Sequence, residues 1–361
     1  QWRRGVSVQM QNVEPGYTSQ SHNTFRIRSM NKSLMIIVIL IVLMLLSVLS
    51  LGTGAVSIGL ADLIGGRLSS TEYQILMDIR LPRVLLNITV GAGVATSGAA
   101  IQGLFRNPLA DPALIGVSSG AALFAAAFLV VGYQSDTLRD LGLLQVGVSG
   151  SAFAGGLLTT FLVLMVGRSS SSISNMLLAG IAINAVALSG VGLFSFVSSD
   201  SQLRSVAFWA LGSFSAADWE MVAVSALILP FLFLIFLESK KLNAITLGDQ
   251  EASHLGVFVP GLRRRVIVYA AIIVGIGVSL VGVISFVGLV VPHLIRLSLG
   301  SNHVTLIPGS ALLGAILVML ADGISRTMFA PAELPVGILT AIVGGPFFIY
   351  LIVNQKERLG I

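Results

Sequence analysis

The stretch LESKKLNAITLGDQEASHLGVFVPGLRRR, residues 237–265, is a polar segment between two long apolar runs, LILPFLFLIF (227–236) and VIVYAAIIVGIGVSLVGV (266–283). Lysine and arginine concentrate in the cytoplasmic loops beside membrane spans. This segment, which we call the polar island, carries five of them: Lys240, Lys241, Arg263, Arg264 and Arg265. The pattern predicts a membrane span on either side of the polar island and places the island itself in the cytoplasm.

Residues 246–256 of the polar island have the pattern of a short amphipathic helix. Asp249 is the expected N-cap, and Gly256 stands where a left-handed C-cap is wanted. Ala252 and Leu255 give the helix a small apolar edge. A structured helix in a cytoplasmic loop indicates a surface for a cytosolic partner.

The composition supports a membrane protein. Of the 361 residues, 55% are hydrophobic and 10% are charged, against about 25% charged in soluble domains. The net charge of +5 does not point to nucleic acid, because the cations stand at the ends of apolar runs. The chain has no cysteine, which excludes disulfides and thiolate metal sites.

A membrane-spanning helix needs roughly 20 apolar residues. By this criterion we predict an all-α polytopic membrane protein with about ten transmembrane helices. The expected spans are 33–52, 83–105, 110–132, 142–167, 174–197, 217–237, 264–281, 283–299, 304–326 and 335–353. The piece 203–214 is too short to span and is expected to lie re-entrant or at the interface.

Charge placement predicts that both termini are cytoplasmic, because this arrangement puts most of the 21 lysines and arginines on the inner side. Residues 1–32 are polar and without periodicity, and we expect a disordered cytoplasmic tail. Met30 has the form of a natural start, which makes 1–29 a candidate extension. A signal peptide over 33–52 is disfavoured by the length of the run and the spans that follow. Residues 33–361 are expected to form a single transmembrane domain.

Arg80 and Arg83 share one helical face at the outer start of the second span. The helix dipole disfavours cations at an N-terminus, so something else should account for the pair. One interpretation is local pairing with Asp78 or Glu72, or contact with lipid phosphate. The other is a docking site for acidic residues of an external partner.

Several other polar residues have simple structural interpretations. The segment 102–116 contains Pro108 and Pro112 and is expected to be a cytoplasmic hairpin. Asp322 and Arg326 are four residues apart and are expected to pair on one helix. His293 is expected to pack or hydrogen-bond, since no second histidine stands at a metal-binding spacing. The chain has no P-loop motif and is not itself an ATPase of that type.

Six stretches together resemble the iron-chelate and cobalamin (FecCD-like) permeases of bacterial ABC importers, and the resemblance covers residues from about 33 to the end. They are RLPR (80–83), QGLFRNPLADPALIGVSSGAAL (102–123), FWALGSF (208–214), LNAITLGDQEASHLGV (242–257), VISFVGLVVPH (283–293) and AELPVGILTAIVGGPFF (332–348). Within that group, GVSSGAAL, EASHLG and PAELPVGI look closest to the haem-uptake permeases.

The resemblance implies a fold like that of the vitamin B12 importer permease and a homodimer of ten-span subunits in the bacterial inner membrane. Two copies of a cytosolic ATP-binding subunit would bind ATP and Mg, and a periplasmic binding protein would deliver the substrate. This chain would be a transport subunit rather than an enzyme, with no cofactor of its own, and would contact membrane lipid but no nucleic acid. Spans 174–197 and 335–353 match those that line the path.

The resemblance also assigns residues. Arg80, Arg83 and Arg326 match arginines that meet glutamates of the binding protein. The short helix of the polar island matches the element that couples the permease to its ATPase. Its expected contact residues are Gly248, Asp249, Glu251, Ala252, His254, Leu255 and Gly256.

The resemblance therefore implies import of haem, with a ferric siderophore or cobalamin as the alternative. Two other classes compete with an importer subunit. An ion-coupled secondary transporter is disfavoured because the spans hold almost no acids apart from Asp322, whereas ion coupling uses intramembrane carboxylates. A membrane scaffold would account for the polar island but less well for the three arginines.

Overall fold

A computed structural model describes residues 31–54, 59, 62, 65–132, 135–140, 143–168, 173–330 and 332–359. These residues form helices and connecting segments, and the described part contains no strand. The predicted tail, residues 1–32, lies outside the described residues except for its last two. Asn31 caps the first helix through a bond from the Ser33 N–H, and Lys32 begins it.

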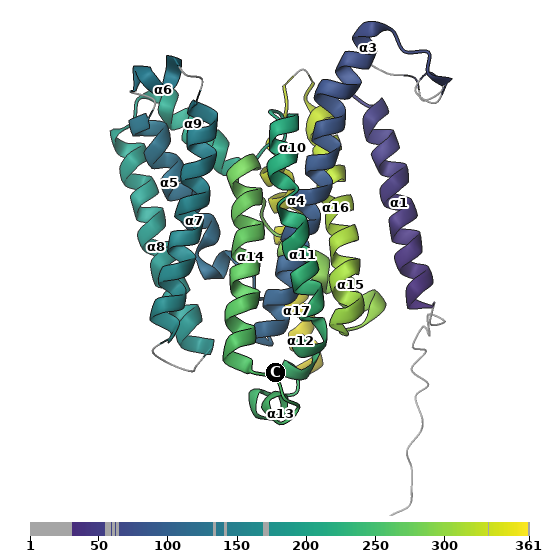
Figure 1. Ribbon diagram of the computed structural model, residues 1–361, viewed down its shortest axis with the longest axis vertical. Helices are drawn as coiled ribbons and strands as arrows, with labels where there is room; N and C mark the ends of the chain where they lie inside the picture. The colour runs from purple at the N-terminus through teal and green to yellow at the C-terminus, as the bar shows by residue number, and fades with distance from the viewer. Residues whose placement is uncertain are drawn as a thin grey trace, which may run out of the picture.

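In the described residues, short segments connect most of the helices. In order they are α1 Lys32–Gly52, α3 Ser70–Gln74, the π-helical turn η1 Ile75–Arg80, α4 Leu81–Phe105, the 3-10 turn η2 Pro112–Ile115, α5 Val117–Val131, α6 Asp136–Asp140, α7 Leu144–Arg168, α8 Ile173–Val197, α9 Asp200–Leu211, α10 Trp219–Ser225, α11 Ile228–Leu237, α12 Ser239–Ile245, α13 Asp249–His254, α14 Val259–Val281, α15 Val287–Leu299, α16 His303–Met328 and α17 Val336–Leu359. Following the predicted topology, we call the end with α3 and α6 the outer end and the end with α13 the inner end (Figure 1).

Each predicted span contains a helix. Within the described residues, seven helical stretches are long and apolar enough to cross a membrane, and shorter apolar helices occupy 117–131, 287–299 and 336–350. The second stretch is longer than predicted, because it begins at Ser70 and continues through η1 into α4. The piece predicted as too short to span is α9, a helix of 12 residues.

α4 is the central helix of the structure. It packs against α16, α14, α15 and α11, and most of its side chains are buried. Glycines permit this close packing: a Cβ added at Gly98 would lie 1.8 Å from the carbonyl oxygen of Gly288, and one added at Gly91 would lie 2.6 Å from that of Gly314. Small residues at such contacts let membrane helices approach closely.

The segment after α4 differs from the expected hairpin. α4 ends at Arg106 in the left-handed conformation, and the chain then returns beside α4 instead of entering the next helix. Asn184, about halfway along α8, donates to the carbonyl of Ala113, and Pro112 lies against Gly288. Pro112 and the left-handed Gly116 interrupt the backbone here, so α5 begins at Val117 rather than at residue 110.

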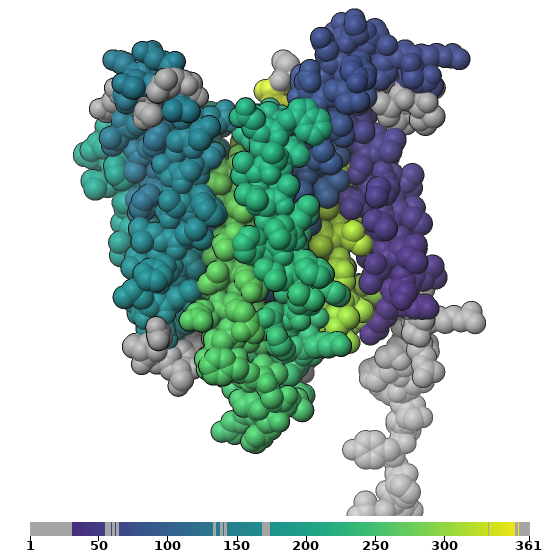
Figure 2. All heavy atoms as spheres, in the orientation of Figure 1, coloured from purple at the N-terminus to yellow at the C-terminus, as the bar shows by residue number. Residues whose placement is uncertain are grey.

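The remaining helices lie on two sides of this centre. α5, α7 and α8 pack on one another as one group, and α1 packs mainly along α16 on the opposite side (Figures 1 and 2). α1 and α8 expose most of their apolar side chains, since only 11% of the most apolar window of each is buried. Apolar surface of this kind is what a membrane protein presents to lipid or to a second subunit.

Candidate functional site

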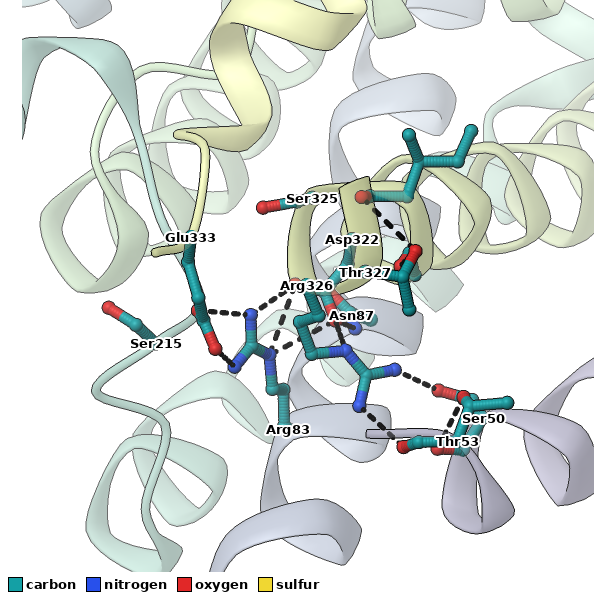
Figure 3. Close-up of polar contacts among 12 residues, drawn as sticks. Ser50, Thr53, Arg83, Asn87, Ser215, Asp322, Ser325, Arg326, Thr327 and Glu333 are labelled. Carbon is teal, nitrogen blue, oxygen red and sulfur yellow. Dashed lines mark hydrogen bonds and ion pairs between the residues drawn. The ribbon is translucent and has the colours of Figure 1, made fainter. Parts of the chain in front are cut away.

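The predicted docking arginines come together at the outer end in a buried ionic cluster. Arg83 lies in the first turn of α4, and its guanidinium faces Asp322 on α16 (Figure 3). Its Nη2 lies 2.8 Å from Oδ1 of Asp322, and its Nε lies 3.1 Å from both carboxylate oxygens. Asn87, one turn further along α4, donates to Oδ2 of Asp322 at 2.9 Å.

A second carboxylate binds the other side of the Arg83 guanidinium. Glu333 lies in the segment between α16 and α17, and its two oxygens accept from Nη1 at 3.1 Å and from Nη2 at 2.9 Å (Figure 3). Arg83 is only 5% exposed. A buried guanidinium needs this number of acceptors because an uncompensated charge away from water is costly.

The other two arginines hold the end of α1. Arg326 lies 3.4 Å from Asp322 and donates to the Ser50 hydroxyl at 2.8 Å and to the Thr53 carbonyl at 3.3 Å. Arg80 donates to the Leu51 carbonyl at 2.6 Å. Helix C-termini leave carbonyls without partners, and arginine side chains can satisfy them. These two cations therefore fasten the outer end of α1 to the rest of the protein.

The sequence prediction was right about one pair in this cluster. Asp322 and Arg326 do interact at i and i+4. Arg83 pairs with Asp322 and Glu333 rather than with the local acids that were proposed, and Glu72 accepts from the Ser69 N–H in the capping box of α3. Sequence reasoning overlooked Glu333 and Asn87. The Ala-Glu-Leu-Pro string gave a signal for Glu333, since it places an acid in the short connection between two spans.

α13 protrudes from the inner end (Figure 1). The helix is shorter than predicted, and the N-cap prediction was wrong: Gly248, with φ of +125°, is the N-cap, and Asp249 is the first helical residue. The carboxylate of Asp249 instead meets Arg263 at 3.0 Å and Arg106 at 3.4 Å. Gly256 has the left-handed φ of +82° that was expected.

The two residues predicted to give this helix its apolar edge have different environments. Ala252 is fully buried against the protein, whereas Leu255 is 65% exposed. Leu247 and Phe258 flank the helix and are 66% and 73% exposed. We call Leu247, Leu255 and Phe258 the inner apolar patch. Glu251, His254 and Gly256 are also exposed. Of the predicted coupling residues, Gly248 and Asp249 are partly buried and Ala252 is buried.

Ionic contacts and hydrogen bonds attach the polar island to the helices around it. Glu238 accepts from Arg265 and from Lys241, each at 2.7 Å. Burial alone would raise the pKa of Glu238, but the hydrogen bonds from the two cations outweigh burial and lower it. On α12, Asn243 accepts from the backbone N–H of His303 and contacts its Nδ1, each at 2.8 Å. The inner end of α16 is thereby joined to the segment that carries α13.

A cavity of about 290 Å³ lies between α4, α14 and the segment 282–286, and a second of about 460 Å³ lies between α7, α10 and α14. Apolar residues line most of the smaller cavity, with Asp111, Ser118 and Ser285 as polar groups. Ligand pockets for small molecules usually measure about 300–1,000 Å³. His293 does not line the smaller cavity and packs edge-on against Phe347 with ring centroids 6.2 Å apart, in the packing role that was expected.

Known proteins resemble the chain along most of its length. Residues 39–354 match the FecCD transport family. The hemin transport system permease protein of Yersinia pestis is 44% identical over 316 residues, which are 86% of this chain and 93% of that protein. The vitamin B12 import system permease protein of Salmonella typhimurium is 36% identical over 311 residues, 86% of this chain and 92% of that protein. A solved inward-facing metal-chelate type ABC transporter is 32% identical, covers 89% of this chain and 99% of its own, and superposes with a TM-score of 0.80.

Proposed function

This chain belongs to the FecCD transport family and is the permease subunit of an ABC importer, and from that premise we propose that it moves haem across the bacterial inner membrane. Permeases of this family work with an ATPase and a substrate-binding protein and are not themselves enzymes. The observation that carries the haem proposal is the 44% identity to a hemin permease, against 36% to a vitamin B12 permease over a similar length.

The proposal places the ATPase at the inner end. α13 projects there with the inner apolar patch at its two ends, and exposed apolar side chains on a polar segment mark a protein contact. The buried Ala252 holds α13 against the protein, while Leu255 is free to enter a groove of a partner. The polar island would then lie in the cytoplasm, as the positive charges beside the spans predict.

The proposal also includes a homodimer with a path between its subunits. The two cavities found among the described residues of one chain measure about 290 and 460 Å³, at the low end of the range for small-molecule sites. α8 exposes Leu178, Val186 and Phe196, and α17 exposes Ile342 and Tyr350. These two helices correspond to the spans that the family resemblance assigns to the path. Two such faces across a two-fold axis would enclose an apolar channel.

The transport cycle follows from these placements. A loaded binding protein docks at the outer end, and ATP binding brings the two ATPase subunits together beneath α13. The movement reaches α16 through Asn243 and His303, and rigid-body rocking opens the path to alternate sides. ATP hydrolysis takes place in the partner subunit.

Reconstitution in liposomes with the ATPase subunit, and with the substrate-binding protein on the outer side, tests the substrate. We expect ATP-dependent, saturable uptake of hemin, and none of a ferric siderophore or of cobalamin under the same conditions. Uptake of cobalamin or the siderophore without hemin would overturn the haem assignment and leave the importer assignment standing. Absence of ATP-dependent uptake of all three would count against both.

A pair of variants tests the inner contact separately. Leu255→Ser should reduce both co-purification of the ATPase subunit and its stimulated ATP hydrolysis. Tyr73→Ser is the matched control, because Tyr73 is also large and 54% exposed but lies at the outer end. Equal loss in both variants, or loss in neither, would refute the assignment of α13 as the ATPase contact.

A further inference from the structure

The two carboxylates that bind Arg83 differ sharply in accessibility. The side chain of Asp322 is 0% exposed, whereas that of Glu333 is 34% exposed. Asp322 is also held by Asn87 and by Arg326. In the part of the chain that the structure describes, the hydrogen bonds and the ion pair of the Glu333 carboxylate go to Arg83.

Glu333 binds Arg83 in the geometry with which arginine recognises any carboxylate. Its two oxygens accept from the two terminal nitrogens of the guanidinium, a parallel pair of charge-assisted bonds. It approaches from the segment between α16 and α17, on the side of the guanidinium away from Arg326 (Figure 3). An external carboxylate that reached Arg83 from this side would need the position that Glu333 fills.

The other two arginines of the cluster have different tasks. Arg80 and Arg326 bind carbonyl and hydroxyl oxygens at the end of α1, and Arg326 also supports Asp322. The three arginines are thus not equivalent as receptors for an acidic partner. Among the described residues, the contact between Arg83 and Glu333 pairs a buried arginine with a partly exposed carboxylate, which could leave so that another could enter.

We propose that Glu333 is an internal competitor for docking, which yields its place on Arg83 to a carboxylate of the binding protein. This inference rests on the proposed function for the identity of the partner. Exchange of one carboxylate for another never leaves the Arg83 charge buried without an acceptor, which is the costly state. Asp322 stays bound throughout and keeps the guanidinium in position. After docking, the return of Glu333 favours release of the partner.

The test measures binding of an acidic probe to the outer cluster. The permease is placed in nanodiscs of phosphatidylcholine, and fluorescein-labelled hexaglutamate is titrated at low ionic strength, where charge attraction is strong. We expect Glu333→Gln to bind the peptide about tenfold more tightly than the unchanged protein, because a charge-assisted bond no longer competes. Glu333 is partly exposed, so this variant should fold.

Two controls separate exchange from a general change in charge. Glu220→Gln removes another exposed acid at the outer end and should change affinity by less than about twofold. Arg83→Gln combined with Glu333→Gln should abolish the gain. The proposal is overturned if Glu333→Gln binds the peptide no more tightly than Glu220→Gln does, or if the gain in affinity survives the loss of Arg83. It is also overturned if neither the unchanged protein nor Glu333→Gln binds the peptide.

Failure of this test is distinguishable from failure of the proposed function. The peptide assay contains no ATPase and no transported solute, so a negative result removes the exchange and leaves the uptake and co-purification results intact. Conversely, the absence of hemin uptake would remove the haem assignment and leave the peptide-binding result at Arg83 intact.

Discussion

Arg83 and Asp322 are 239 positions apart in the sequence, yet Nη2 of Arg83 lies 2.8 Å from Oδ1 of Asp322. The pair joins the first turn of the central helix α4 to the outer part of α16. Arg326 and Asn87 also contact Asp322, so one buried carboxylate organises the outer end.

Asp322→Asn should destabilise the protein strongly. The substitution keeps the shape of the side chain but leaves Arg83 and Arg326 without their buried anion, and removal of one partner of such a pair costs about 3–5 kcal/mol. Thermal unfolding in detergent, followed by tryptophan fluorescence, measures the loss. Glu333→Gln should cost about 1 kcal/mol or less, because Glu333 is partly exposed and Asp322 remains. Equal losses in the two variants would contradict the ranking.

Gly98→Ala should prevent the close contact between α4 and α15. The added methyl would lie 1.8 Å from the Gly288 carbonyl oxygen, so one helix must move, at a cost of about 3 kcal/mol or more. Gly150→Ala on α7 is the control, since a Cβ there meets nothing within 4 Å. It should be neutral or slightly stabilising. Size-exclusion profiles and unfolding midpoints of both variants check this, and a well-folded Gly98→Ala protein would show that the contact is less tight than described.

Acid should weaken the attachment of the polar island through Glu238. Its pKa lies below the ordinary value of 4.5, so the folded protein binds this proton less readily than the unfolded chain. The stabilisation is present above pH 4.5 and is lost as the pH falls through the lower folded pKa. The Glu238→Gln variant should be less stable than the unchanged protein near neutral pH. Its stability should also fall less than that of the unchanged protein between pH values of about 5 and about 3. Parallel unfolding curves for the two proteins across that range would exclude this contribution.

Single-cysteine labelling should place α13 in the cytoplasm. The chain has no cysteine, so His254→Cys and Tyr73→Cys each introduce one thiol at an exposed position, on α13 and on α3 respectively. In intact spheroplasts, a membrane-impermeant maleimide should label Tyr73→Cys and reach His254→Cys only after permeabilisation. The reverse pattern would invert the topology and with it the side on which the ATPase binds.

The sequence alone determined the features that depend on local composition. Apolar runs placed the spans because a helix must be long and apolar to cross a bilayer, and the short α9 was recognised by the same measure. Gly256 was recognised as a left-handed position because glycine adopts that conformation at little cost. The pairing of Asp322 with Arg326 followed from the helical repeat.

Only the tertiary structure decided which distant groups satisfy one another. The partners of Arg83 come from α16 and from the segment before α17, and no local spacing relates them to the start of α4. The N-cap of α13 is Gly248 rather than the predicted Asp249, because the Asp249 carboxylate pairs with Arg263 and Arg106. The chain between Arg106 and Val117 returns beside α4, where Asn184 donates to the Ala113 carbonyl and Pro112 packs against Gly288. Buried charges and backbone groups must find partners wherever the packed helices bring them, and a linear sequence does not contain that information.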